Sequence, residues 1–213
     1  MNVEISNTVS AATSQASIGR LERVKNILLA PSEEWARSAT EPASIGQLCT
    51  LYVIPLSAFA AGMSFVHTSI IGVRLAFGGW LRTPAITGLV HAVMSLGIGV
   101  LGVFMVGFII NALAPRFCGQ RDQRQAFKAA AYSLTPALLS PALALLPAFA
   151  TVLTLLAGCY GIYILSRSLP VLMHAPRERA AGYTVLVVSC TILLGILLGI
   201  FAAATGMLGV RPH

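Results

Sequence analysis

The chain has 213 residues, of which 56% are hydrophobic and 10% are charged, and its formal net charge is +7. This composition excludes an ordinary soluble globular protein and is typical of a small polytopic membrane domain. In a soluble protein the positive charge would indicate nucleic acid, but here it is better explained by the basic loops that orient membrane proteins. We therefore expect an integral membrane protein without a nucleic-acid partner.

The first 43 residues are more polar than the rest of the chain. Residues 1–16 are rich in Ser, Thr, Asn and Gln, which predicts a disordered cytoplasmic tail. Residues 17–43 predict two short helices at the membrane surface, because apolar residues from Ile18 to Leu28 recur at helical spacing opposite polar ones. The candidates for contact with lipid headgroups or the interface in this region are Arg20, Arg23, Lys25 and Trp35.

Residues 44–210 predict an all-α membrane domain, a bundle of five transmembrane helices. The first span begins near Ser44 and the second covers residues 85–113. Residues 129–167 hold no Asp, Glu, Lys or His, and as one helix they would measure about 57 Å, whereas the hydrocarbon layer is about 30 Å thick. They must therefore fold back, near Pro147, into spans three and four. A basic connector over residues 170–179 leads to the fifth span, residues 181–210.

Charge placement gives this domain an orientation. Eleven of the fourteen Lys and Arg residues fall on the N-terminal side of the five-span scheme, and three fall on the other side. Cytoplasmic loops are enriched in Lys and Arg, so we expect the N-terminus in the cytoplasm and the C-terminus outside. Arg116, Arg121 and Arg124, in the loop before the third span, are topology signals that could also hold anionic headgroups.

Two prolines interrupt the third predicted span. Proline lacks an N–H, so Pro136 and Pro141 deprive the carbonyls of Tyr132 and Ala137 of their helical donors. Unpaired carbonyls are costly in lipid and are tolerated where side chains, neighbouring helices or water take them up. We therefore expect this segment to be kinked and enclosed by protein.

The candidate binding or gating residues are the prolines and polar side chains within the spans: Tyr132, Ser133, Thr135, Pro136, Pro141, His91 and Asn111. For the group around Pro136, the favoured interpretation is that hydroxyls repair the kink, and binding is the alternative. A lone intramembrane imidazole such as His91 is a functional hypothesis, but a neutral, hydrogen-bonded histidine is favoured. Asn111 is interpreted as a contact between helices or as a cap.

No pattern in the sequence indicates catalysis. We find no catalytic triad, metal-binding or phosphate-binding motif, and no acidic residue lies within a predicted span. The four cysteines are scattered without C-x-x-C spacing, which fits apolar filling better than a metal site. We therefore expect no catalytic residues, metal or cofactor, and no enzymatic activity.

The order of features resembles a known family. A surface helix ending in ILLAPSEEW, five spans, a basic loop before AAAYSLTP and a tyrosine-containing fourth span together resemble a Yip1-domain membrane protein of the bacterial kind, over about residues 20–208. The resemblance implies five helices and a cytoplasmic N-terminus. Eukaryotic members are linked to Rab GTPases and vesicle traffic, while bacterial members mostly lack an assigned activity. The Asp-Leu-Tyr-Gly-Pro segment of the eukaryotic members is not found here, so Rab-like partners are not expected.

Two functions remain open on these grounds. The first is to bind or organise membrane components, namely lipids, other membrane proteins or a second copy of the chain, without chemistry. The alternative is a transporter or channel for a neutral or lipid-like solute, along a path lined by the proline-kinked helices.

The charge count generates a topology prediction. Reporter fusions at Gln120 and at His213 should read cytoplasm and exterior respectively, because an odd number of spans, the third to the fifth, lies between these two positions. Reporters placing both positions on one side would contradict the five-span scheme.

Overall fold

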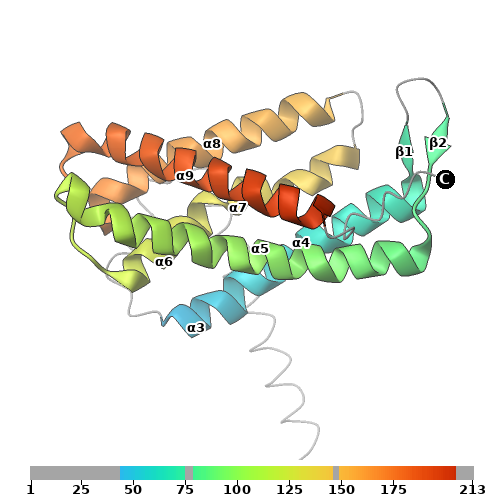
Figure 1. The fold of residues 1–213 in the computed structure, drawn as a ribbon, viewed down its shortest axis with the longest axis horizontal. Coiled ribbons are helices and arrows are strands. Elements are labelled where there is room, and N and C mark those ends of the chain that lie inside the picture. Colours follow the sequence, from blue (N-terminus) through green and yellow to red (C-terminus); the bar gives the residue numbers. More distant parts are fainter. Residues whose placement is uncertain (1–43, 75–78, 146–148, 205–213) are drawn as a thin grey trace, which may run out of the picture. The chain divides into compact units, whose positions relative to one another are not determined.

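The computed structural model describes residues 44–74, 79–145 and 149–204 (Figure 1). The chain divides into two units, Met1–Glu41 and Pro42–His213, and the described residues belong to the second. Several sequence predictions therefore lie outside the described residues: the tail, both surface helices with Arg20, Arg23, Lys25 and Trp35, the hinge at Pro147, and the end of the fifth span.

In the described part of the chain, four helical stretches are long and apolar enough to cross a membrane: Ile45–Ile71, Ala85–Phe117, Ala150–Leu172 and Arg177–Leu197. Apart from one short hairpin, the ordered elements described are helical, so the predicted all-helical class is confirmed. The predicted third span is not among the four, because it is broken into pieces too short to be counted.

The first stretch consists of four consecutive pieces: α3 (Ile45–Leu48), a π-helical turn (Cys49–Val53), α4 (Ile54–Phe65) and a second π-helical turn (Val66–Ile71). It begins where the sequence predicts, since Ser44 and Gln47 form a reciprocal capping box. Pro55 removes a helical donor, and the preceding turn widens so that the Ile54 N–H reaches the carbonyl of Cys49.

A hairpin joins this stretch to the next helix. Strands β1 (Val73–Arg74) and β2 (Trp80–Leu81) pair antiparallel. Gly72 enters the hairpin at φ 89°, a left-handed conformation that favours glycine. Helix α5 (Ala85–Leu113) then has the bounds predicted for the second span, and a 3₁₀ turn (Ala114–Phe117) extends it.

The predicted proline segment forms the centre of the bundle. It consists of α6 (Gln123–Ser133), α7 (Thr135–Leu139) and a 3₁₀ turn (Ser140–Leu145), with the break at Leu134. The helix begins six residues before the predicted start at residue 129, so Arg124 lies on α6 and not in the loop. Asp122 begins it by accepting the backbone N–H groups of Arg124 and Gln125. Helix α6 packs on α5 and α8, and α7 packs on α4 and α8, as Figure 1 shows. The segment is therefore both broken and enclosed, as the sequence predicts.

Helices α8 (Ala150–Leu172) and α9 (Arg177–Ala204) pack against each other, and α9 also packs on α5. The predicted connector over residues 170–179 is too long, because α8 continues through Pro170 to its end two residues later. Proline is tolerated there since only the last helical turn is affected. The Tyr183 hydroxyl donates to the Ile110 carbonyl, and its ring stacks on Phe117 at 4.9 Å, which joins α9 to α5.

The contact between α8 and α6 generates a stability prediction. A Cβ atom at Gly161 would lie 2.7 Å from the carbonyl oxygen of Ser133, so Gly161→Ala forces the two backbones apart. We expect a loss of about 1–3 kcal/mol in the free energy of unfolding, measured as a lower Tm in detergent.

Gly158→Ala is the matched control, one helical turn away. Nothing lies within 4 Å of its Cβ position, so the added methyl should raise helix propensity by about 1 kcal/mol without a clash. Equal melting temperatures for the two variants would contradict the proposed close approach.

Candidate functional site

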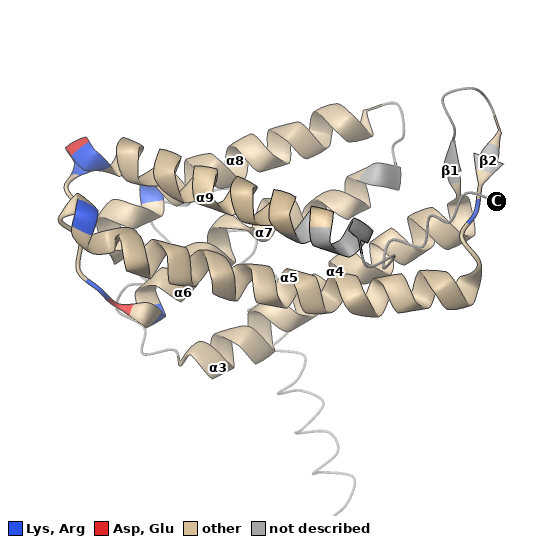
Figure 2. Cartoon of the chain, in the orientation of Figure 1, with Lys and Arg blue, Asp and Glu red and all other residues tan. Residues whose placement is uncertain are grey.

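Basic residues gather at one end of the bundle, as Figure 2 shows. They come from the loop before α6, from α6 itself, and from the neighbouring ends of α8 and α9: Arg116, Arg121, Arg124, Lys128, Arg167, Arg177 and Arg179. Arg82 follows β2 and precedes α5, whereas Arg116 follows that helix, so the two lie at opposite ends of α5. We call the first group the basic end.

One backbone and one side-chain hydrogen bond hold the loops of the basic end together. The Gln120 N–H donates to the Met173 carbonyl at 2.8 Å, and the Arg179 guanidinium donates to the Cys118 sulfur at 3.1 Å. These contacts join the loop before α6 to the turn between α8 and α9. The arginines are therefore presented on a fixed surface.

The charge of the basic end is only partly offset by carboxylates. Asp122 caps α6, and Glu178 lies in the first turn of α9. Within residues 44–74, 79–145 and 149–204, no ion pair joins either carboxylate to Arg116, Arg121 or Arg124, which are all exposed. These three side chains are thus free to meet an anionic group. Lys128 differs, because its side chain is buried.

The helix break is surrounded by buried polar contacts. The Tyr52 and Tyr132 rings meet edge to face at 5.2 Å, and the Tyr52 and Thr135 hydroxyl oxygens lie 2.8 Å apart. The Thr135 hydroxyl donates its one hydrogen to the Ala131 carbonyl at 3.1 Å, so Tyr52 is the donor to Thr135. These bonds join α6 and α7 to the first span.

A hydroxyl group repairs the kink at Pro141. Ser140 donates to the Ala137 carbonyl at 2.7 Å, the carbonyl that Pro141 leaves without a donor. Ser133 donates to the Ala130 carbonyl at 3.2 Å. Pro136 lies in the first turn of α7, where a missing N–H costs little. The polar residues of the break thus serve its backbone first.

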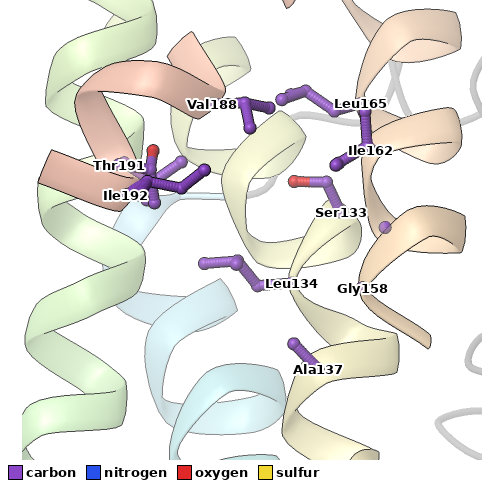
Figure 3. A pocket seen from close by; sticks show the side chains of 11 residues that line it. Ser133, Leu134, Ala137, Gly158, Ile162, Leu165, Val188, Thr191 and Ile192 are labelled. Atoms are coloured by element: carbon purple, nitrogen blue, oxygen red, sulfur yellow. The ribbon is translucent and has the colours of Figure 1, made fainter. Parts of the chain in front are cut away.

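A pocket of about 150 Å³ lies beside the break. Figure 3 shows α8 and α9 as its two walls, with Ser133, Leu134 and Ala137 between them. The lining residues come from α5, α6, α7, α8, α9 and the break itself: Val106, Ser133, Leu134, Ala137, Gly158, Gly161, Ile162, Leu165, Val188, Thr191 and Ile192.

The pocket is chemically apolar despite two hydroxyl groups in its lining. Ser133 and Thr191 each donate to a carbonyl of their own helix, the latter to Val187 at 2.8 Å. Of the predicted site residues, only Ser133 lines it. The walls could not be predicted from the sequence, since the aliphatic and glycine residues of α8 and α9 are of the same types as lipid-facing ones.

The candidates Asn111 and His91, on α5, lie outside both the pocket lining and the break. Asn111 donates from Nδ2 to Oε1 of Gln123 at 2.8 Å, so it links α5 to the start of α6, as interpreted from the sequence. His91 is partly exposed near the start of α5, and no hydrogen bond joins it to another described residue. The hydrogen bond favoured for His91 is therefore not found in the described part of the chain.

Comparison with known proteins identifies the family. The Yip1 domain model matches residues 25–203, most of the chain. The chain belongs to the Yip1 domain family. The resemblance drawn from the sequence is thus confirmed, and the Yip1 domain includes the basic end, the break and the pocket.

Curated relatives of this Yip1-domain protein are membrane proteins by name. The chain is similar to "Inner membrane protein YohC" of Escherichia coli strain K12 and to the protein of that name from Escherichia coli O6:H1. Each is 25% identical over 169 residues, which cover 78% of this chain and 85% of the relative. No solved structure matches the chain.

The apolar lining generates a prediction about water access. Single cysteines placed from Tyr132 to Ala142, in a background lacking the four native cysteines, should be protected from a water-soluble thiol reagent. The reason is that the pocket's hydroxyls are bonded to backbone and its other lining groups are apolar. Labelling at Ser133 and Ala137, which both line the pocket, would instead indicate a wet cavity.

Proposed function

We propose that this Yip1-domain protein binds and organises lipids of the bacterial inner membrane, without chemistry, and holds anionic headgroups at its basic end. The observation that carries the proposal is the collection of exposed arginines on one fixed surface (Figure 2). Basic groups beside a membrane attract anionic lipids, by about 1 kcal/mol for each Lys or Arg. Other membrane proteins, a second copy included, would be the partners of such organisation.

The same surface supports a cytoplasmic position for the basic end. Lys and Arg near span ends set orientation, and most of the described ones gather there, whereas Arg74 and Arg82 belong to the hairpin region that precedes α5. The names of the curated relatives support the inner membrane as the location. The N-terminus would then lie in the cytoplasm and the C-terminus outside.

The broken segment supplies the fifth crossing in this proposal. It starts beside the end of α8, because Gln120 bonds to Met173 there. Since α8 returns to that end, the segment from Gln123 to Leu145 must travel away from it. At 1.5 Å per residue it reaches about 34 Å, enough for a hydrocarbon layer of about 30 Å.

One observation favours the alternative of a solute path. A broken helix packed against α4, α5 and α8 is an arrangement like the discontinuous helices that secondary transporters use for substrate sites. The apolar pocket beside it would admit a neutral or lipid-like solute. Flux of such a solute in proteoliposomes containing only this protein would favour transport over binding.

The proposed headgroup site predicts a selective loss of lipid binding. In the variant with Arg116→Gln, Arg121→Gln and Arg124→Gln, preference for phosphatidylglycerol over phosphatidylethanolamine should fall about a hundredfold, from about 1 kcal/mol for each arginine. The measurement is the lipid retained by purified protein after exchange into mixed micelles, by mass spectrometry.

Arg82→Gln is the control, because it removes one arginine from the opposite end of α5. It should keep the preference for the anionic lipid. Salt should weaken binding by the unmodified protein and leave the triple variant nearly unchanged. An unchanged preference in the triple variant would contradict the proposal.

A further inference from the structure

We propose that the pocket between α8 and α9 seats one acyl chain of an anionic phospholipid, laid over the break between α6 and α7. This inference rests on the proposed function. It names the part of the lipid that the fold recognises in addition to the headgroup.

The first argument is depth within the membrane. On α9 the lining residues Val188 to Ile192 lie 11 to 15 positions beyond Arg177, or about 17–22 Å along the helix axis. On α8, Gly158 to Leu165 lie 7 to 14 positions before Leu172, or about 10–21 Å. Both walls thus fall within a hydrocarbon layer of about 30 Å. Acyl chains are the surrounding medium at that depth.

The second argument is continuity with the lipid-facing surface. Ile162 and Ile192 line the pocket, yet their side chains are 42% and 57% exposed. In a membrane those exposed faces meet lipid. An acyl chain lying along the outside of α8 and α9 can therefore enter the pocket without crossing a polar barrier.

The third argument is chemical. The two hydroxyls in the lining give their hydrogens to backbone carbonyls, so the lining side chains offer a ligand no free hydrogen-bond donor. A water molecule needs two to four polar partners to be held in a cavity. A hydrocarbon chain needs none. The lining therefore favours a chain of methylene groups over water or a polar solute.

The fourth argument is size. A cavity of about 150 Å³ is comparable with an engineered apolar cavity that stays dry and binds benzene. It therefore accepts a few carbons of a chain and not a whole lipid. Left empty, its walls would lose dispersion contacts that an acyl chain restores.

Two glycines of α8, Gly158 and Gly161, shape the pocket. Gly161 lets α8 approach the Ser133 carbonyl, and this brings Gly158, one turn away, over the break. Gly158 lines the pocket and has nothing within 4 Å of its Cβ position. A large side chain there would project into the space proposed for the acyl chain.

Photocrosslinking tests the assignment directly. The full chain is reconstituted in vesicles of phosphatidylethanolamine and phosphatidylglycerol that contain phosphatidylglycerol with a diazirine in one acyl chain. Illumination should place crosslinks on Ile162, Leu165, Val188 and Ile192 above the level at exposed α5 positions such as Val93. Gly158→Leu should lose this excess, while Gly195→Leu, on α9 outside the pocket lining and also without neighbours within 4 Å, should keep it.

The outcomes separate this inference from the proposed function. Crosslinks spread evenly over the lipid-facing surface, or an excess that survives Gly158→Leu, would overturn the acyl-chain site. A zwitterionic probe giving the same pocket excess as the anionic one would keep the acyl-chain site and count against headgroup selection. If Gly158→Leu fails to fold, Gly158→Val with Gly195→Val repeats the comparison, and survival of the excess would again overturn the site.

Discussion

The fold depends on the requirement that backbone polar groups in a membrane find partners within the protein. Leaving one unpaired in hydrocarbon costs several kcal/mol, whereas a hydrogen bond between membrane helices contributes about 0.6 kcal/mol. The segment with Pro136 and Pro141 is where this requirement is hardest to meet. It is met locally, since the Ser140 hydroxyl takes the carbonyl that Pro141 orphans, and by enclosure, since α4, α5 and α8 pack around the break.

Enclosure in turn depends on small residues. Lipid gives no hydrophobic drive for helices to associate, so close backbone approach must supply contact. Gly161 allows α8 to reach the Ser133 carbonyl. Gly107 likewise allows α5 to approach α6, since a Cβ atom at this position would lie 3.2 Å from the Phe127 Cα. The same use of glycine at position 158 has the opposite result. No neighbour fills the space it leaves, and the pocket opens there.

The sequence predicts features that are local in the chain. The bounds of α5, the start of the first span near Ser44 and the repair of a proline kink by a hydroxyl follow from residues within a few positions of one another. Features that depend on distant segments were not predicted. The walls of the pocket come from α8 and α9, and the burial of Lys128 depends on packing around α6. The predicted end of α8, before Pro170, was wrong, because the helix includes this proline and ends at Leu172.

Charge and apolar space occupy different depths in this bundle, and that separation follows from solvation. Most of the arginines lie at the end of the bundle, where water and lipid phosphate can reach them, because burying a charge in hydrocarbon is costly. Along α9 the first lining residue, Val188, lies nine positions beyond Arg179, or about 13–14 Å further in. On α8, Arg167 comes closer, two positions beyond Leu165. A molecule that binds both the basic end and the pocket must be charged at one end and apolar at the other. A phospholipid has this chemical character. Salt screens the contact between its headgroup and the arginines, but it leaves the packing of its acyl chain in the pocket unchanged.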